Sequence, residues 1–314
     1  MKSSTMGSAF PFQSINEEEN PMPEVTPERL ITILTEQGPH AAELAKADLR
    51  QIALHQRDLG GLDFSGLNLN GADFEKSDLS GATFAETQLM RARFNQANLS
   101  DARFGGANLD GAIFSRATLD GASFRNAVLS HARFGDRSLR HADLAGARLQ
   151  GAHFQGSDLQ GLDLSGRDLG GAQFQHVDLT LVDFTAARLD GTRLDSVTVK
   201  GALFNGVDFS EAFLAGIDFH GADLIGAIFR DATIVQVRFR NTRLIRADLR
   251  AIDMAEVSFA GADLRAADFR QVDLEIEIDF TNALLDGADF TGARVLEGQL
   301  EQAASLQDAT LPEE

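Results

Sequence analysis

The sequence contains no cysteine, no tryptophan and no tyrosine. Without cysteine the chain forms no disulfide and offers no thiolate chemistry, which is typical of proteins made in a reducing compartment. No apolar run approaches the ~20 residues that a membrane-spanning helix needs, and the first residues lack the hydrophobic core of a secretory signal. We therefore expect a soluble protein of the cytoplasm.

Basic residues are scarce, with 28 Lys and Arg against 47 Asp and Glu and a formal net charge of −19. The excess is concentrated at the ends: residues 1–48 carry eight acids and three bases, and residues 296–314 carry five acids and no base. So acidic a chain argues against a nucleic-acid partner and favours the basic groove of a protein partner. The alternative is that the acidity only keeps a long molecule in solution.

The sequence does contain a period of five. From Leu49 to Leu274 every fifth residue is apolar, and the stretch Asp101–Asp120 reads DARFGGANLDGAIFSRATLD, with Leu or Phe two residues after each Ala. Five matches neither the 3.6 of a helix nor the 2 of a strand, so each unit must be a short extended piece followed by a turn. Four units closing a square give a twenty-residue coil, and such coils would stack ~4.8 Å apart.

Units such as GADFE, GANLD, GASFR, GADLI and GADFT resemble the pentapeptide-repeat family, whose motif is written A-(D/N)-L-x-x. The resemblance implies an all-β solenoid, a right-handed quadrilateral β-helix, here of about 11–13 coils with short helical caps at both ends. The best understood members bind DNA gyrase or topoisomerase IV as DNA mimics and protect against their poisons, an antibiotic-resistance role. Others are secreted effectors.

Local signals divide the chain. Thr26–Glu28 reads as a helix start, Leu296 and Leu300 share a helical spacing, and the period lengthens by one between Leu274 and Phe280. We expect a disordered N-terminal tail at 1–24, a helical cap at 25–48, the β-helix at 49–295 with a one-residue bulge near 275–279, and a helical C-terminal cap and tail at 296–314.

Nothing in the sequence predicts catalysis. The seven histidines show no metal-binding spacing, and no phosphate-binding loop or nucleophile elbow occurs. The many Asp residues precede the central Leu or Phe of their units, where they point outward and can bond the turn. A filled core leaves no enzyme-like pocket, so we expect no enzymatic activity, no cofactor and no metal.

If residues twenty apart stack in successive coils, each outward residue can be assigned to one face of the rod. This assignment predicts a partner-binding acidic ridge on two adjoining faces. Its seven members are Asp143, Asp158, Asp163, Asp178, Asp183, Asp218 and Asp223. The alternative interpretation of these carboxylates is turn bonding, repeated because the motif repeats. Later coils add a basic band of Arg230, Arg238, Arg240, Arg243, Arg246 and Arg250, which would make the rod an imperfect DNA mimic.

Apolar side chains also stand at outward positions and predict a contact or dimer patch. Leu203, Ile225 and Ile245 fall on one face, beside the ridge, and Phe213 and Val235 fall on another. Either a partner or a second copy of the chain would bind there. The alternative is that loops or cap residues cover these side chains.

These observations favour a non-enzymatic, protein-binding solenoid. Its sharpest version is a DNA mimic that binds a type II topoisomerase and protects it from a poison. A second hypothesis is a secreted effector or adaptor scaffold that uses residues 1–24 as a flexible export tail, and a third is a purely structural spacer.

Overall fold

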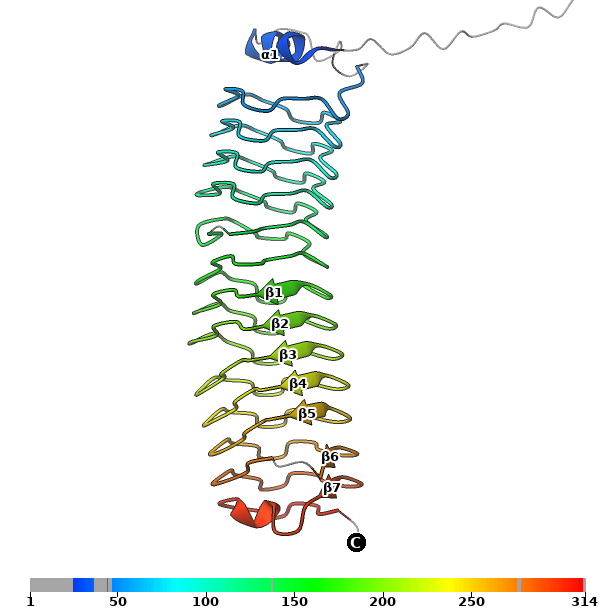
Figure 1. Cartoon of the computed structure of the whole chain (residues 1–314), viewed down its shortest axis with the longest axis vertical. Coiled ribbons are helices and arrows are strands. Elements are labelled where there is room, and N and C mark those ends of the chain that lie inside the picture. Colours follow the sequence, from blue (N-terminus) through cyan, green and yellow to red (C-terminus); the bar gives the residue numbers. More distant parts are fainter. Residues whose placement is uncertain (1–24, 37–43, 45–46, 137, 276–277, 313–314) are drawn as a thin grey trace, which may run out of the picture.

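The computed structural model describes residues 25–36, 44, 47–136, 138–275 and 278–312. They form one long rod of stacked coils, with an α-helix across the N-terminal end and the C-terminus at the opposite end (Figure 1). The elements are α1 (Pro27–Thr35), β1 (Gln173–Gln175), β2 (Arg193–Asp195), β3 (Phe213–Ala215), β4 (Thr233–Val235), β5 (Asp253–Ala255), β6 (Asp273–Leu274), β7 (Arg294–Val295) and the 3₁₀ helix η1 (Leu300–Gln302).

Each coil takes twenty residues. One column of parallel pairs runs from Ala53 through β1–β5 to Asp253, with every partner twenty residues beyond the last. Three more columns begin at Asp58, Asp63 and Asn68. Strands β1–β5 form a parallel sheet in that order, β6 pairs with β7, and most other units pair through a single residue. This arrangement confirms the predicted four-sided β-solenoid.

Tight turns join the four sides of a coil. The N–H three residues after a central Leu or Phe bonds back to its carbonyl, as the Ala72 N–H does to the Leu69 carbonyl at 3.0 Å. Gly71 between them takes a φ of +71°, a conformation that glycine adopts without steric cost. No described β-branched residue has a positive φ, because branching at Cβ makes that conformation costly. The turn therefore explains the frequent glycine in the motif.

Leu and Phe fill the interior in stacked columns. The rings of Phe84, Phe104 and Phe124 stack with centroids 4.9 and 5.0 Å apart, close to the spacing of neighbouring strands. Phe94, from another Phe column, meets Phe104 edge-on at 5.7 Å. Ala102, two residues before Phe104, is fully buried, because only a small side chain fits beside so filled a core.

Helix α1 covers the first coil, as Thr26–Glu28 predicted. The Thr26 side chain accepts a backbone N–H of the first turn, which caps the helix. Leu30 and Ile33 are buried in the hydrophobic core, and Glu28 forms an ion pair of 2.7 Å with Arg57 of the first coils. The expected tail at 1–24 lies outside the described residues, as does most of the chain between α1 and residue 47.

The helical cap expected at 296–314 must be corrected. Its described residues contain one turn of 3₁₀ helix, η1, and the chain then returns to the solenoid pairing. Ser305 pairs with Leu284 and Thr310 with Asp289. The segment therefore adds a last, incomplete coil instead of a helix that closes the end.

The inserted residue near 275–279 changes the register of the coils beyond it. Ser258 pairs with Asp279, and Asp263 with Leu284, at a separation of 21 instead of 20. This shift confirms the insertion, although residues 276–277 themselves lie outside the described part of the chain.

Candidate partner-binding surface

The structure brings part of the acidic ridge together. Asp158 pairs with Asp178 on one face, and Asp163 pairs with Asp183 on the next, so each pair lies about one strand spacing apart along the rod. Thr198 follows Asp178 and separates it from Asp218, and Leu203 lies between Asp183 and Asp223. Asp143 stands one coil before Asp163, but no β-bridge joins the two in the described part of the chain. The ridge is therefore two carboxylate pairs with three outlying members, Asp143, Asp218 and Asp223.

Three of the seven carboxylates are neutralised by arginines of neighbouring coils. Asp143 pairs with Arg125, and Asp158 pairs with Arg140 at 3.1 Å. The third pair joins Asp223 to Arg243 at 2.7 Å. The remaining four have no ion-pair partner among the described residues: Asp163, Asp178, Asp183 and Asp218.

Turn bonding, the alternative interpretation of the ridge, also has direct support. Six of the seven carboxylates accept the backbone N–H two residues later through Oδ1, Asp223 being the exception. In Asp163 and Asp183, however, Oδ2 has no hydrogen-bond partner in the described part of the chain. One oxygen of each carboxylate serves the turn, and the second remains available to a partner.

The turn contacts lower the pKa of two ridge carboxylates, Asp163 and Asp178. Hydrogen bonds from the Ser165 hydroxyl and N–H lower the pKa of Asp163, and nearby Arg167 adds to the effect. Burial alone would raise the pKa of Asp178, but hydrogen bonds from Thr180 and the 2.6 Å bond from Gln160 outweigh it, and this pKa is lowered too. Both groups carry full negative charge near neutral pH.

The predicted basic band is half neutralised. Arg243 pairs with Asp223, while Arg230 and Arg250 both contact Asp248 at 2.7 Å. Arg238, Arg240 and Arg246 have no carboxylate within ion-pair distance in the described part of the chain.

The predicted apolar patch lies on two separate faces. Leu203 is 42% exposed, and Ile225 and Ile245 follow each other in successive coils of the same face, half-buried. On the sheet face, the guanidinium of Arg193 lies 4.2 Å from the centroid of the Phe213 ring, and Val235 at the end of β4 is half-buried. The Leu203 face is thus the more open of the two.

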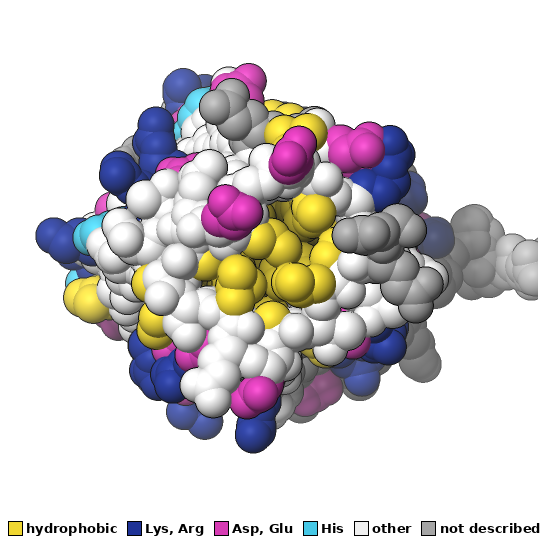
Figure 2. All heavy atoms as spheres, turned by 90° about the horizontal axis from the view of Figure 1, so that it is seen from below, with side chains coloured by type: hydrophobic (Ala, Val, Ile, Leu, Met, Phe, Trp, Pro, Cys, Tyr) yellow, Lys and Arg dark blue, Asp and Glu magenta, His cyan; other side chains and the backbone are white. Residues whose placement is uncertain are grey.

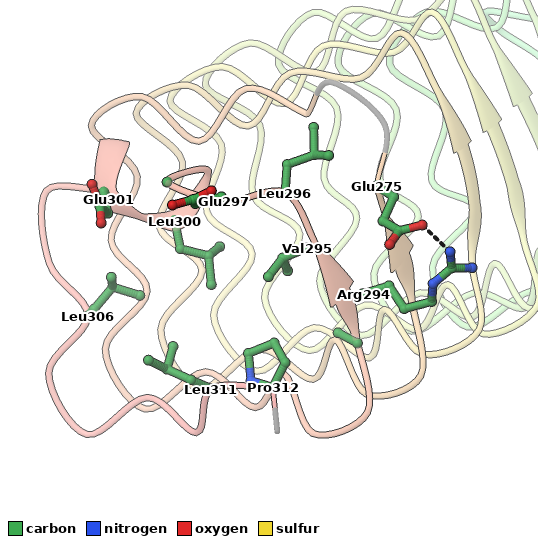
Figure 3. Close-up of a pocket in the computed structure, with 12 residues that line it drawn as sticks. Glu275, Arg294, Val295, Leu296, Glu297, Leu300, Glu301, Leu306, Leu311 and Pro312 are labelled. Carbon is green, nitrogen blue, oxygen red and sulfur yellow. Dashed lines mark hydrogen bonds and ion pairs between the residues drawn. The ribbon is translucent and has the colours of Figure 1, made fainter. Parts of the chain in front are cut away.

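A further apolar surface, not predicted from the sequence, lies at the C-terminal end of the rod (Figure 2). A hollow of about 540 Å³ opens there between the last coil and the chain terminus (Figure 3). The signal was present in the sequence: AASLQDATL contains two further units of the motif, centred on Leu306 and Leu311. The helical spacing of Leu296 and Leu300 obscured them.

The described residues contain no group of three His, Asp or Glu side chains arranged to hold a metal ion. In the same part of the chain, no helix has the length and apolar character needed to cross a membrane.

Comparison with family models matches the chain to pentapeptide repeats along most of the rod. The model "Pentapeptide repeats (8 copies)" matches residues 58–96, 163–201, 202–241 and 242–275, and "Pentapeptide repeat region" matches residues 87–164. A search of curated proteins finds no match.

Several solved structures are similar to the chain at low identity. HetL, a protein involved in heterocyst differentiation regulation from the cyanobacterium Nostoc sp. strain PCC 7120, is 21% identical over 76% of this chain and 88% of its own, with a TM-score of 0.43. Rfr23 from the cyanobacterium Cyanothece 51142 is 23% identical over 35% and 85%, with a TM-score of 0.27. Full-length QnrB1, a plasmid-mediated fluoroquinolone resistance protein, is 16% identical over 73% and 91%, with a TM-score of 0.19.

Proposed function

This chain belongs to the pentapeptide-repeat protein family, and from that premise we propose that it is a non-enzymatic rod that binds another protein through its acidic ridge. The observation that carries the proposal is the pair Asp163 and Asp183. Both are carboxylates in successive coils, and neither has an ion-pair partner among the described residues. A basic groove would desolvate and pair these carboxylates, which favours association with a positively charged surface.

The finer proposal is that the ridge imitates DNA for a type II topoisomerase. The four carboxylates without an ion-pair partner, from Asp163 to Asp218, span about three coils, or roughly 14 Å at the usual strand spacing. That is about one charge every 3.5 Å, against one every ~1.7 Å along duplex DNA. The ridge therefore supports a partial mimic with about half the charge density of DNA, whose binding should weaken as salt screens it.

The test is a DNA gyrase supercoiling assay with the full-length protein, with and without a quinolone, together with direct binding measurements to gyrase and topoisomerase IV. We expect binding that decreases with salt and protection from the quinolone. The informative variant replaces Asp163, Asp183 and Asp218 by Asn, because the hydrogen bonds that each accepts from the described residues reach only Oδ1. An Asn side-chain carbonyl can still accept the turn N–H, so only the charge is removed.

The matched control replaces Asp58, Asp63 and Asp208 by Asn. These carboxylates lie outside the ridge and accept the corresponding turn N–H from residues 60, 65 and 210. Because three Asp are again replaced by Asn, the change in net charge equals that of the ridge variant. The ridge variant should lose binding and protection while the control keeps both. Absence of binding to either topoisomerase would refute the finer proposal, and equal loss in both variants would refute the assignment of the ridge.

A further inference from the structure

The two ends of the rod are built differently. At the N-terminal end, α1 covers the first coil and buries Leu30 and Ile33 against it. At the C-terminal end, the described residues place only the single 3₁₀ turn η1 and no α-helix beside the last coil, and the core side chains form the floor of an open hollow (Figures 2 and 3). Repeat proteins bury the core of a terminal unit under a cap, so an uncovered apolar end marks a contact site.

The hollow itself is apolar. Figure 3 shows side chains of the last coil and of the chain near its terminus around the hollow, with Leu296 directed away from Leu311 and Pro312. Leu296 is 43% exposed and Leu311 is 54% exposed, although both stand beside the core. The apolar residues of the hollow are Ala293, Val295, Leu296, Leu300, Leu306, Leu311 and Pro312.

The rim of the hollow is acidic. Glu297 and Glu301 line it, and neither has an ion-pair partner among the described residues. Glu275 also lines it but pairs with Arg294. The last nineteen residues of the sequence contain five acids and no base, and the one basic residue of the lining, Arg294, pairs with Asp273 and Glu275.

This charge argues against a second copy of the chain as the occupant. Two rods meeting end to end would bring two acidic rims together, and like charges placed across an interface weaken it. An apolar segment with basic flanks has the opposite charge and fills the same hollow. We propose that the C-terminal end is a second binding site, separate from the acidic ridge, for a basic amphipathic segment of another protein.

The probe for the test is a short synthetic amphipathic peptide of Leu and Lys, labelled for fluorescence anisotropy, and its acidic analogue with Glu in place of Lys. The full-length protein should bind one Leu/Lys peptide, and the acidic analogue should bind at least about tenfold more weakly. Replacing Leu296 by Ser should weaken binding to a similar extent. Leu296 is partly exposed, so an unchanged thermal melt will show that the variant is folded.

A pair of charge-reversal variants separates the end from the rest of this acidic protein. Glu297→Lys with Glu301→Lys changes the rim, and Glu86→Lys with Glu211→Lys makes the same change in net charge at exposed positions outside both the rim and the ridge. We expect the rim variant to bind the Leu/Lys peptide at least about tenfold more weakly, and the Glu86/Glu211 variant to bind within about twofold of the original.

Three results would overturn the proposal. Equal weakening in the two charge variants would show that the peptide only senses overall charge. Absence of peptide binding would show that the hollow takes no such segment. A dimer in sedimentation velocity that Leu296→Asp dissociates would show that a second copy is the occupant. The topoisomerase assay changes ridge residues and the peptide assay changes rim residues, so failure of this proposal is distinguishable from failure of the topoisomerase proposal.

Discussion

Removing a single ring from the stacked core should have a large and local effect. Phe104 is fully buried and contacts four other rings: it stacks on Phe84 and Phe124 at 4.9 and 5.0 Å and meets Phe94 and Phe114 edge-on at 5.7 and 6.2 Å. Phe→Ala substitutions in cores cost about 3–5 kcal/mol, and each aromatic pair adds about 0.5–1.5 kcal/mol beyond its buried area. We therefore expect Phe104→Ala to cost about 5 kcal/mol.

The matched control is Phe104→Leu. Two coils further along the same column, Leu144 occupies the equivalent position, so a leucine fits this site in the solenoid. The leucine variant should lose the ring contacts but leave a much smaller cavity, and it should cost at least about 2 kcal/mol less than the alanine variant.

Urea unfolding followed by circular dichroism measures both variants, and native-state hydrogen exchange locates the loss. Because each coil contacts only its neighbours, the alanine variant should exchange faster in the coils from Phe84 to Phe124 and little elsewhere. A cost below about 1 kcal/mol for the alanine variant, or equal costs for both, would refute the role given to the stacked rings.

Three other predictions concern single side chains. Burial alone would raise the pKa of Asp248, but hydrogen bonds chiefly from Arg250 hold it at about 2. The stability that this ionised carboxylate contributes is fully present above its unfolded-state pKa of ~3.9 and should be lost as pH falls towards 2. In an acid titration, the stability of Asp248→Asn should therefore fall less steeply over that range than the stability of the original chain. Thr242 is buried and donates a 2.8 Å hydrogen bond to the Phe219 carbonyl, so thermal unfolding of Thr242→Val should show a loss of about 1–3 kcal/mol, and no change would contradict the assigned bond. Leu181 is 66% exposed at a φ of +60°, so Leu181→Asn should gain up to about 1 kcal/mol in urea unfolding, and a loss would show that its side chain packs favourably.

The period of five was enough to predict the coil, the columns and the location of the core. The reason is that each Leu or Phe at a fifth position between Leu49 and Leu274 takes the same inward position. Once this register is known, it assigns every other residue of the repeats to an inward or an outward position. The C-terminal cap could not be predicted in the same way. Leu296 and Leu300 fit a helix as well as a solenoid, and the choice depends on pairing of Ser305 and Thr310 with earlier coils, which are long-range contacts.

The register also could not show which carboxylates of the ridge lack an ion-pair partner. The sequence placed Asp143 and Asp163 on one face, but the side chain of Arg125 neutralises only Asp143. That outcome depends on the directions in which long side chains lie across neighbouring coils, and these directions are not encoded in the spacing. The spacing therefore predicted where these carboxylates lie, and side-chain geometry showed which of them have an ion-pair partner.

The difference between the two ends of the rod limits how copies can assemble. A head-to-tail filament, like any cross-β fibril, grows only when each subunit offers an open edge at both ends. In this molecule α1 closes one end, and the acidic rim repels another rim at the other. The rings and parallel strands of this rod have nearly fibrillar spacing, and α1 covers the edge at which a further copy would have to add.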